Sequence, residues 1–465
     1  MPLPNNTLLP EVPLPQKAPL PQKDSLLRKW AKARSNEIAL VNEDEHVTWE
    51  VLLNKVIARS ESLNEMGVAA GDVVACVGKN DDFLVKIALS CQEIGAIFAP
   101  IAFSPREIIK KKLESITPKL VFEQQPSGEW ECQKQDRFVS PELQLAISSL
   151  IFTSGSTGDP KAVAHTESNH ITSATGLLSE FEFKWGDSWL LSLPLYHVSG
   201  LAIFWRWLVS GAAMSIPTTK GWLHDLRFVT HASLVSTQLK RLLESDDIGL
   251  LKRVLLGGSH IPNTLIDGAQ NRGIDTWMGY GLTEAASTVT AKRTNQKPSS
   301  GKVLPCREIQ CVEGEIRLRG DTLSSGYYRQ GQIKPLQDED GWFSTGDLGY
   351  LEEGELIVVG RKDNRFISGG ENVHCEEIEA TLSALIDVRV AIVIPVKDEV
   401  YGFRPIAFLD TDSLQPKKVY ERTLASKLEK FKWPIEYHLM PSDPQKHGGV
   451  KISRKWLETW LSERA

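Results

Sequence analysis

The strongest constraint on the fold is a regular alternation of short apolar runs with helical patterns, from about residue 24 to residue 290. Apolar runs such as VVACVG, AIFAPI, SLIFTS, HASLVS and RVLLGG have the length of buried strands, and the segment from Phe83 to Ile94 has helical spacing. Strands that alternate with helices form parallel sheets whose faces the helices cover. The sequence therefore predicts an α/β protein with mixed or parallel sheets covered by helices.

The 465-residue chain exceeds what one compact core usually supports and indicates more than one domain. Residues 1–22 are rich in proline and are expected to form an extended arm. Residues 23–360 are predicted to form a large N-terminal domain, in which short glycine-separated strands after about residue 300 suggest a small β-barrel-like part. Residues 361–465 follow the pattern of a separate, small C-terminal α+β domain.

Composition and charge limit the class of partner. The net charge is −6, with 41% hydrophobic and 24% charged residues. The sequence has no long basic stripe, so a nucleic-acid partner is not expected. The uncharged run 188–205 contains a proline, a histidine and a glycine, which favours a buried strand, turn and helix over a membrane span. No signal peptide is recognisable, and six cysteines without a CxxC pair indicate reduced thiols in a cytoplasmic protein. These features leave monomer and homo-oligomer equally open.

The strongest local signal is the segment TSGSTGDPK, residues 153–161, directly after the apolar run SLIF. Its hydroxyls and backbone N–H groups can surround phosphate oxygens, and its glycines allow a close approach. Lys161 adds a positive charge. The spacing differs from the GxxxxGK[ST] P-loop, and a flexible Ser/Gly loop is the alternative.

Two further glycine-rich turns follow apolar runs: LGGSH, residues 256–260, and MGYGLTE, residues 278–284. Glycine-rich loops at the carboxyl ends of strands suit a ligand in the crevice of an open sheet. Tyr280 is suited to stack on a flat base, and the Glu284 carboxylate is suited to Mg²⁺ beside phosphates. The alternative for Glu284 is a glutamate at a helix N-terminus.

Three motifs lie later in the chain. In STGDL, residues 344–348, Asp347 could accept hydrogen bonds from both hydroxyls of a ribose, or could be an ordinary turn aspartate. The segment GRKDNRFISGGEN spans residues 360–372, and GGVKISR spans residues 448–454. Taken alone, Lys451 in the last motif has the character of a solvated surface charge.

In this order, TSGSTGDPK, GYGLTE, STGD, GRKDN and GGVKISR resemble the motifs of the adenylate-forming superfamily. That superfamily comprises acyl-CoA synthetases, adenylation domains of non-ribosomal peptide synthetases and firefly-type luciferases. The resemblance extends from about residue 25 to residue 460. It implies an AMP-forming acid–thiol ligase that uses ATP, Mg²⁺ and coenzyme A, with a mobile C-terminal domain that closes over the substrates.

The resemblance also implies residue roles. It assigns ATP or AMP binding to Thr153, Ser154, Gly155, Ser156, Thr157, Gly158, Lys161, Gly258, Ser259, Gly279, Tyr280, Gly281, Thr283, Asp347 and Arg361. It assigns catalytic roles to Lys451, Glu284 and Thr153, with Glu284 as the Mg²⁺ ligand. Lys451 corresponds to the lysine that bridges the reacting carboxylate and the α-phosphate, and Asp363 corresponds to the hinge.

Within the superfamily, the segments PLYHVSG, WRWL, HASLVSTQ and GGVKISR are similar to the branch that couples o-succinylbenzoate to coenzyme A in menaquinone biosynthesis. Arg206 lies inside the apolar run LAIFWRWL, and an unpaired buried guanidinium is unfavourable by several kcal/mol, so an anion is expected beside it. The second carboxylate of a dicarboxylic acid would meet this need, with Ser233 and Thr237 adding hydrogen bonds. The alternatives are an internal salt bridge or a side chain that reaches solvent. The resemblance places His197 near the acyl pocket.

Two departures from the family pattern stand out: Val373, His374 and Cys375 follow GGEN, and Gly449 and Val450 precede Lys451. Three other functions stay open at this point. The chain could activate another aryl or medium-chain acid, although Arg206 disfavours a plain alkyl acid. It could bind nucleotide without catalysis, although Lys451 and Glu284 are both present. It could act in protein interaction through residues 1–22.

Overall fold

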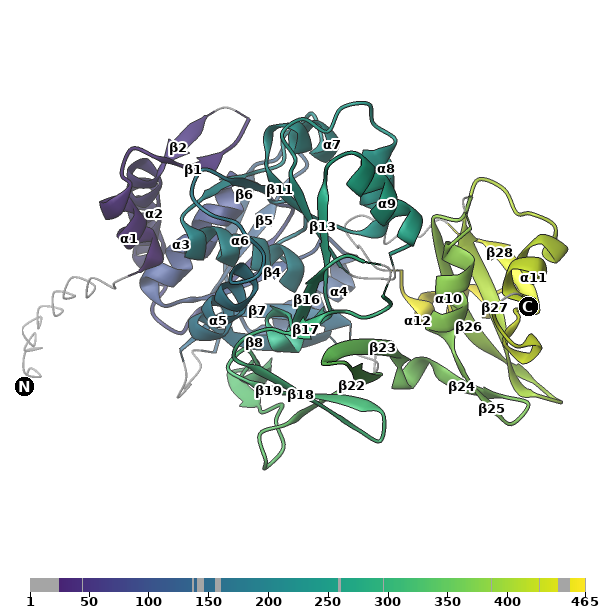
Figure 1. The fold of residues 1–465 in the computed structure, drawn as a ribbon. Helices are drawn as coiled ribbons and strands as arrows, with labels where there is room; N and C mark the ends of the chain where they lie inside the picture. Colours follow the sequence, from purple (N-terminus) through teal and green to yellow (C-terminus); the bar gives the residue numbers. More distant parts are fainter. Residues whose placement is uncertain are drawn as a thin grey trace, which may run out of the picture.

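The computed structural model describes residues 25–43, 45–135, 138–139, 146–154, 160–257, 261–295, 297–385, 387–425, 427–441 and 452–464. Within these residues the strands form sheets of thirteen, eight, five and two strands. Figure 1 shows the elements from residue 361 onward, in green to yellow, gathered beside the purple-to-green remainder of the chain. None of the described helices has the length and apolar character needed to cross a lipid bilayer.

The helices are α1 (Leu26–Ala33), α2 (Trp49–Glu65), α3 (Asp82–Ile94), α4 (Arg106–Ile116), α5 (Glu167–Leu178), α6 (Val198–Ser210), α7 (Trp222–Asp225), α8 (Ser236–Leu243), α9 (Asn263–Asn271), α10 (Cys375–Ser383), α11 (Lys417–Ala425) and α12 (Arg454–Ser462). Several begin at the side-chain caps that their sequences favour. The Asp81 side chain accepts a hydrogen bond from the Leu84 N–H at the start of α3. Thr166 and Asn169 form a reciprocal capping box at the start of α5.

The eight-stranded sheet has the spatial order β21 (Gln332–Lys334), β20 (Gly326–Arg329), β8 (Pro160–Thr166), β7 (Ile147–Ser154), β4 (Ile97–Ile101), β3 (Val73–Val77), β5 (Leu120–Gln124), β6 (Trp130–Lys134). Its central strands β7, β4, β3 and β5 run parallel, and antiparallel strands extend both edges. Every residue of β3 and β4 is buried. Continuous burial is typical of parallel strands covered on both faces, as the apolar runs predicted.

The thirteen-stranded sheet has the spatial order β18 (Arg307–Val312), β19 (Glu315–Gly320), β22 (Phe343–Glu352), β23 (Glu355–Arg361), β17 (Lys302–Val303), β16 (Thr290–Arg293), β13 (Asp275–Met278), β12 (Arg253–Leu256), β11 (His231–Leu234), β9 (Ser188–Leu190), β10 (Ala213–Ser215), β1 (Ile38–Val41), β2 (His46–Thr48). Strands β13 through β1 are parallel. The strands expected to form a barrel-like part divide between the two large sheets: β17, β18, β19, β22 and β23 continue this sheet in antiparallel order, and β20 and β21 extend the eight-stranded sheet. The described strands close no barrel. Antiparallel strands joined by short turns can extend an existing sheet edge, so the sequence pattern alone does not distinguish the two arrangements.

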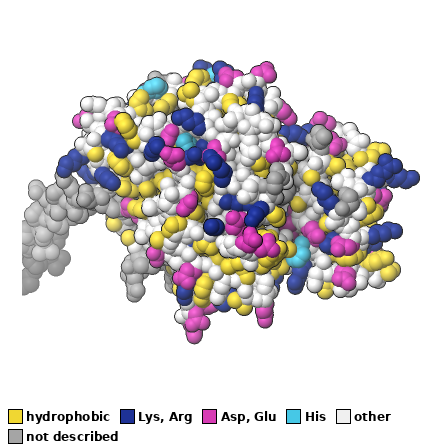
Figure 2. Space-filling model, in the orientation of Figure 1, with side chains coloured by type: hydrophobic (Ala, Val, Ile, Leu, Met, Phe, Trp, Pro, Cys, Tyr) yellow, Lys and Arg dark blue, Asp and Glu magenta, His cyan; other side chains and the backbone are white. Residues whose placement is uncertain are grey.

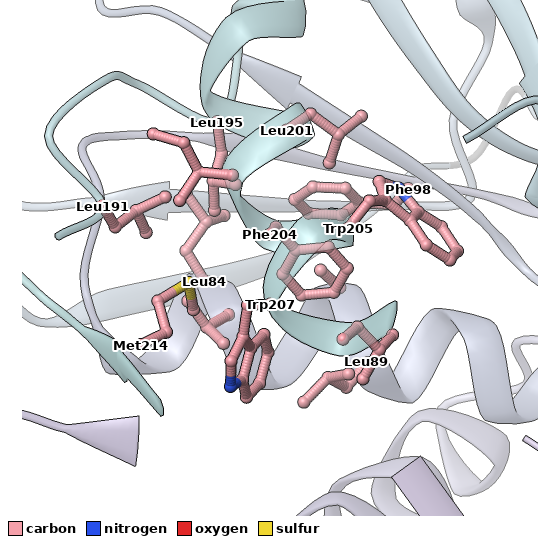
Figure 3. Close-up of a cluster of buried hydrophobic side chains, with 14 of the residues drawn as sticks. Leu84, Leu89, Phe98, Leu191, Leu195, Leu201, Phe204, Trp205, Trp207 and Met214 are labelled. Atoms are coloured by element: carbon pink, nitrogen blue, oxygen red, sulfur yellow. The ribbon is translucent and has the colours of Figure 1, made fainter. Parts of the chain in front are cut away.

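The main hydrophobic core lies between the two large sheets and centres on α6. Figure 3 shows Phe204, Trp205 and Trp207 of this helix gathered with the side chains of Phe98 and Met214, which come from opposite sheets. The Trp207 ring stacks on Trp49, with the ring centroids 5.3 Å apart. Every residue of α6 from Gly200 to Leu208 is buried, so a polar side chain in this part of the helix is removed from solvent.

The C-terminal part has a sheet of its own. It contains β25 (Glu371–His374), β24 (Arg365–Ser368), β27 (Gly402–Asp410), β26 (Val390–Asp398) and β28 (Glu436–Leu439). Two hydrophobic clusters made only of residues after 365 pack against it. Val373 and Cys375, two of the departures from the family pattern, are both buried in the first cluster, so they serve packing there.

Surface charges of both signs are interspersed. On the face shown in Figure 2, Lys and Arg side chains lie among Asp and Glu side chains over the described residues. Many pair directly, such as Arg253 with Asp275 and Lys362 with Glu315. This face therefore presents no broad field of a single sign.

Candidate active site

The hairpin of β7 and β8 presents the residues expected to bind phosphate. Thr153 lies directly opposite Lys161 in the antiparallel register, so both residues are placed at the end of the hairpin next to the segment that joins its two strands. Both side chains are half-buried. Ser154 ends β7. Gly155, Ser156, Thr157 and Gly158 lie outside the described residues, so their assignment stays a prediction.

Glu284 lies close to this hairpin through a tyrosine. It belongs to a short 3₁₀ turn, Thr283–Ala285, and its Oε1 accepts a hydrogen bond of 2.9 Å from the Tyr327 hydroxyl. The Lys161 ammonium lies 5.2 Å from the centroid of the Tyr327 ring. Burial and the Glu284 charge raise the pKa of Tyr327, which stays protonated and able to donate. Lys161 and Glu284, from the first and second motifs of the series, thus both contact one tyrosine.

Tyr280, Asp347 and Arg361 form a second cluster. The Tyr280 hydroxyl donates to Asp347 Oδ2 at 2.5 Å, and the Arg361 guanidinium donates to Asp347 Oδ1 at 3.0 Å. Burial, together with the Asp347 charge, raises the pKa of Tyr280 well above its usual value. Three residues assigned to nucleotide binding therefore lie in contact, and the carboxylate is oriented from both sides.

The two glycines that flank Tyr280 are required by the backbone. A Cβ at Gly279 would clash with the Thr290 carbonyl, and one at Gly281 would clash with the Ser287 carbonyl. Close strand approach is therefore sufficient to explain these glycines without a nucleotide. Gly258 and Ser259 lie outside the described residues.

Arg206 on α6 is 2% exposed and therefore does not reach solvent. Its guanidinium donates to Thr288 Oγ1 at 3.0 Å and lies 5.4 Å from the Trp189 ring. Within the described part of the chain, no carboxylate pairs with it, and its Nε has no hydrogen-bond partner. Burial, with a contribution from the positive Arg307, lowers its pKa to about 9, so it is charged at neutral pH. Neither alternative considered for Arg206, the salt bridge or the exposed side chain, is found.

The other residues expected to bind the acid lie on neighbouring segments. Ser233 on β11 is 4% exposed, and its hydroxyl has no hydrogen-bond partner among the described residues. Its carbonyl accepts a 2.6 Å hydrogen bond from Ser192, in the segment that leads to His197. His197 directly precedes α6, and its ring packs edge-on against Tyr196. Thr237 is half-buried on α8, which begins two residues after β11 ends.

Asn80, which the sequence did not single out, holds the segment that precedes His197. Its side-chain amide donates to the Leu191 and Leu193 carbonyls at 3.2 and 2.8 Å, and its oxygen accepts from the Leu195 N–H at 2.9 Å. β9 ends at Leu190 and is shorter than the apolar run predicted. The bonds to Asn80 therefore take the place of strand-to-strand hydrogen bonds for the backbone of the residues that follow. Only the three-dimensional approach of residue 80 to residues 191–195 reveals this role.

Two buried histidines, also not singled out, link the Glu284 turn to α6. His165 Nε2 bonds the Thr283 carbonyl at 2.7 Å, and His170 Nε2 bonds Ser149 Oγ at 2.8 Å. The rings of His165 and His170 are 4.7 Å apart, and His170 stacks on Trp205 beside Arg206. Burial lowers the pKa of His165 to about 4 and the pKa of His170 well below its usual value, so both histidines stay neutral at physiological pH.

The buried His165 predicts acid sensitivity. Between pH 6.5 and about 4 the unfolded chain binds a proton at this residue and the folded chain does not, so stability falls as pH falls. The free energy of unfolding, measured with urea, should fall between pH 7.5 and pH 5 in the parent protein. We expect this fall to be about 2 kcal/mol smaller in His165→Gln. His170 is present in both proteins, so the difference isolates residue 165. Equal losses in the two proteins would contradict this assignment.

The expected hinge lies at the end of β23. Asp363 pairs with Arg361, whose Nε lies 2.9 Å from Oδ1, and Asn364 donates to Glu376 of α10 at 2.5 Å. Arg454, at the start of α12, makes two 2.7 Å bonds to Glu379, and burial raises the pKa of that carboxyl to about 7. Lys451 lies outside the described residues. The hinge and the lysine assignments therefore stay predictions.

Comparison with known proteins gives one consistent family. Residues 27–328 match the AMP-binding enzyme family. The chain is 40% identical over 447 residues to the 2-succinylbenzoate–CoA ligase of Salmonella typhimurium, with 94% of this chain and 97% of the relative covered.

Solved structures agree. A variant of E. coli MenE with bound OSB-AMS matches with a TM-score of 0.84 at 35% identity, covering 95% of this chain and 99% of the other. The o-succinylbenzoate coenzyme A synthetase of Bacillus subtilis, in complex with ATP and magnesium ion, matches with a TM-score of 0.81 at 25% identity, covering 93% and 99%.

Proposed function

Because the chain belongs to the AMP-binding enzyme family, we propose that it is an ATP-dependent o-succinylbenzoate–CoA ligase of menaquinone biosynthesis. The observation that carries the choice of acid is Arg206, a buried cation for which the described residues supply no counter-charge. The named relatives, which align along almost their whole length, point to the same acid.

The proposed reaction has two steps. A carboxylate oxygen of the acid attacks the α-phosphorus of ATP, the bond to pyrophosphate breaks, and an acyl-adenylate forms. The thiolate of coenzyme A then attacks the acyl carbon, and AMP leaves as the thioester forms. The first step brings two anions together, so it needs positive charge in a site with little water.

The residues divide this work by position. Thr153 and Lys161, with residues 154–158, would hold the phosphates at the end of the β7–β8 hairpin where the two strands are joined. Asp347 would accept hydrogen bonds from the ribose while Tyr280 and Arg361 orient it. Lys451 would bridge the reacting carboxylate and the α-phosphate after residues 361–465 close on residues 23–360, with Asp363 as the hinge.

Glu284 fits a magnesium ion that arrives with ATP. One carboxylate oxygen is bonded to Tyr327, which leaves the other oxygen for a cation. Magnesium is usually held by one or two protein carboxylates together with phosphate oxygens and water. When bound there, it would neutralise charge on the phosphates and so assist the departure of pyrophosphate.

Arg206 would hold the second carboxylate of o-succinylbenzoate. A guanidinium pairs with a carboxylate through parallel hydrogen bonds, and its Nε, buried without a partner among the described residues, is free for one of them. Ser233, whose buried hydroxyl also has no partner among these residues, and Thr237 would add hydrogen bonds. A simple monocarboxylic acid would leave the buried cation unpaired.

A pyrophosphate-release assay tests the proposal. With ATP, Mg²⁺ and coenzyme A, we expect strong preference for o-succinylbenzoate over benzoate and octanoate. Activity only on the monocarboxylic acids would keep the two-step ligase reaction and reject the role of Arg206. Absence of pyrophosphate release with every acid of a broad panel would reject the ligase assignment.

A further inference from the structure

Tyr327 lies between two charged residues that the sequence places far from it. It is on β20, opposite Val163 of β8, two residues beyond Lys161 in that strand. Its side chain is half-buried, and its neighbour Tyr328 points to the opposite face of the strand, into the core. Tyr327 is therefore placed at the site by sheet register.

Its two ends make different contacts. The hydroxyl donates to Glu284 Oε1 at 2.9 Å, and the ring face receives the Lys161 ammonium at 5.2 Å from the centroid. An ammonium at this distance from an aromatic face is stabilised by the ring quadrupole. The Tyr327 side chain thus contacts the Lys161 ammonium with its ring and the Glu284 carboxylate with its hydroxyl.

Without this arrangement, Lys161 and Glu284 could attract each other. Opposite unit charges attract more strongly near a protein surface than in bulk water, because the effective dielectric constant is lower there. Such a pair would use the lysine needed for phosphate and the carboxylate needed for Mg²⁺. Among the described residues the two do not form an ion pair, and Tyr327 is the side chain that both contact.

We propose that Tyr327 is a positioning residue that keeps Lys161 and Glu284 apart and oriented for the phosphates and Mg²⁺ of ATP. The proposal rests on the proposed function for the roles of those two residues. It makes the contribution of Mg²⁺ to ATP affinity depend on a tyrosine that would bind neither the metal nor the acid.

Calorimetric titration with ATP, in the presence and absence of Mg²⁺, tests the proposal on the full chain. The measured quantity is the ratio of the ATP affinity with Mg²⁺ to the ATP affinity without Mg²⁺. Tyr327→Phe keeps the ring and loses the hydrogen bond to a charged group, so we expect the ratio to fall about tenfold. Tyr327→Leu also frees Lys161 to pair with Glu284, so the ratio should fall further.

Tyr328→Phe is the matched control, since it removes the same hydroxyl from the adjacent residue on the other face of β20. Its ratio should equal that of the parent protein. AMP lacks the β- and γ-phosphates, so its affinity should change less than twofold in Tyr327→Phe. An unchanged ratio in Tyr327→Phe, or an equal loss of AMP affinity and ATP affinity, would overturn the proposal.

The readout does not depend on the acid. If the acid panel fails but ATP binds with a Mg²⁺ contribution, the proposed ligase function is rejected and Tyr327 is still tested. If the panel succeeds and Tyr327→Phe keeps the full Mg²⁺ contribution, this inference alone is rejected. A thermal melt of each variant separates loss of binding from loss of folding.

Discussion

Lys451→Ala is expected to slow formation of the acyl-adenylate by about 10³-fold or more, while the transfer of a supplied acyl-adenylate to coenzyme A continues at close to the parent rate. In the first step a carboxylate approaches a phosphate, and negative charge grows on the phosphoryl oxygens. A single cation in a site with little water stabilises that charge strongly. In the second step a neutral acyl carbon meets a thiolate, and this lysine is not required.

The two half-reactions can be measured separately. Adenylation is followed by pyrophosphate release in single-turnover conditions, and thioester formation is followed from purified o-succinylbenzoyl-adenylate and coenzyme A. Lys455→Ala is the matched control, because Lys455 is an exposed lysine on the first turn of α12. Near-parental adenylation in Lys451→Ala, or an equal loss in both half-reactions, would contradict the assigned role.

Arg206→Ala is expected to raise the KM for o-succinylbenzoate by about 10²-fold, which corresponds to the loss of a charge-assisted pair of about 2–3 kcal/mol. The KM for ATP should stay within twofold, since Arg206 contacts Thr288 and Trp189, neither of which is assigned to ATP binding. Arg206→Met, which also removes the guanidinium but keeps an apolar side chain of similar size, should fold as well as the parent protein or better, because it removes a buried charge that lacks a carboxylate partner among the described residues. Lower affinity together with unchanged or higher stability is the signature of a residue retained for binding.

Three comparisons sharpen this test. Arg206→Lys keeps the charge but loses the parallel hydrogen bonds, so its KM should lie between those of the parent and Arg206→Ala. Arg241→Ala, which removes an exposed arginine from α8, should leave the KM unchanged. Benzoate has no second carboxylate, so its turnover should be insensitive to residue 206. An unaffected KM for o-succinylbenzoate in Arg206→Ala would reject the proposed pairing.

The α/β class, the parallel strands and the separate C-terminal sheet could all be predicted from sequence, because they follow from local periodicity. β3 and β4 are each continuously apolar and continuously buried. The buried Arg206 was also predictable, since one arginine in an apolar helical run leaves few alternatives. The sheet that each strand after residue 300 joins was not predictable, since a short antiparallel strand can pair with any sheet edge that lies near it.

The residues that sequence reasoning missed share one property: they act on backbone or side chains far away along the chain. Asn80 bonds residues 191–195, His165 bonds Thr283, and Tyr327 joins Glu284 to Lys161. Nothing in the local pattern of an asparagine after a strand, or of a tyrosine in a short strand, indicates such partners. A glycine pattern can also suggest a binding role that the fold does not require. The close approach of neighbouring backbone is sufficient to require Gly279 and Gly281, whatever they contribute to nucleotide binding.

The opposed positions of Thr153 and Lys161 decide which changes of length the chain can accept. Successive residues of a strand face opposite sides of a sheet, so one residue inserted within β8 after Lys161 would turn that lysine away from the site. The same insertion between the two paired residues leaves both side chains where they are and alters only the segment that joins them. Functional versions of this hairpin should therefore keep a constant number of residues in the strands that lead to Thr153 and away from Lys161.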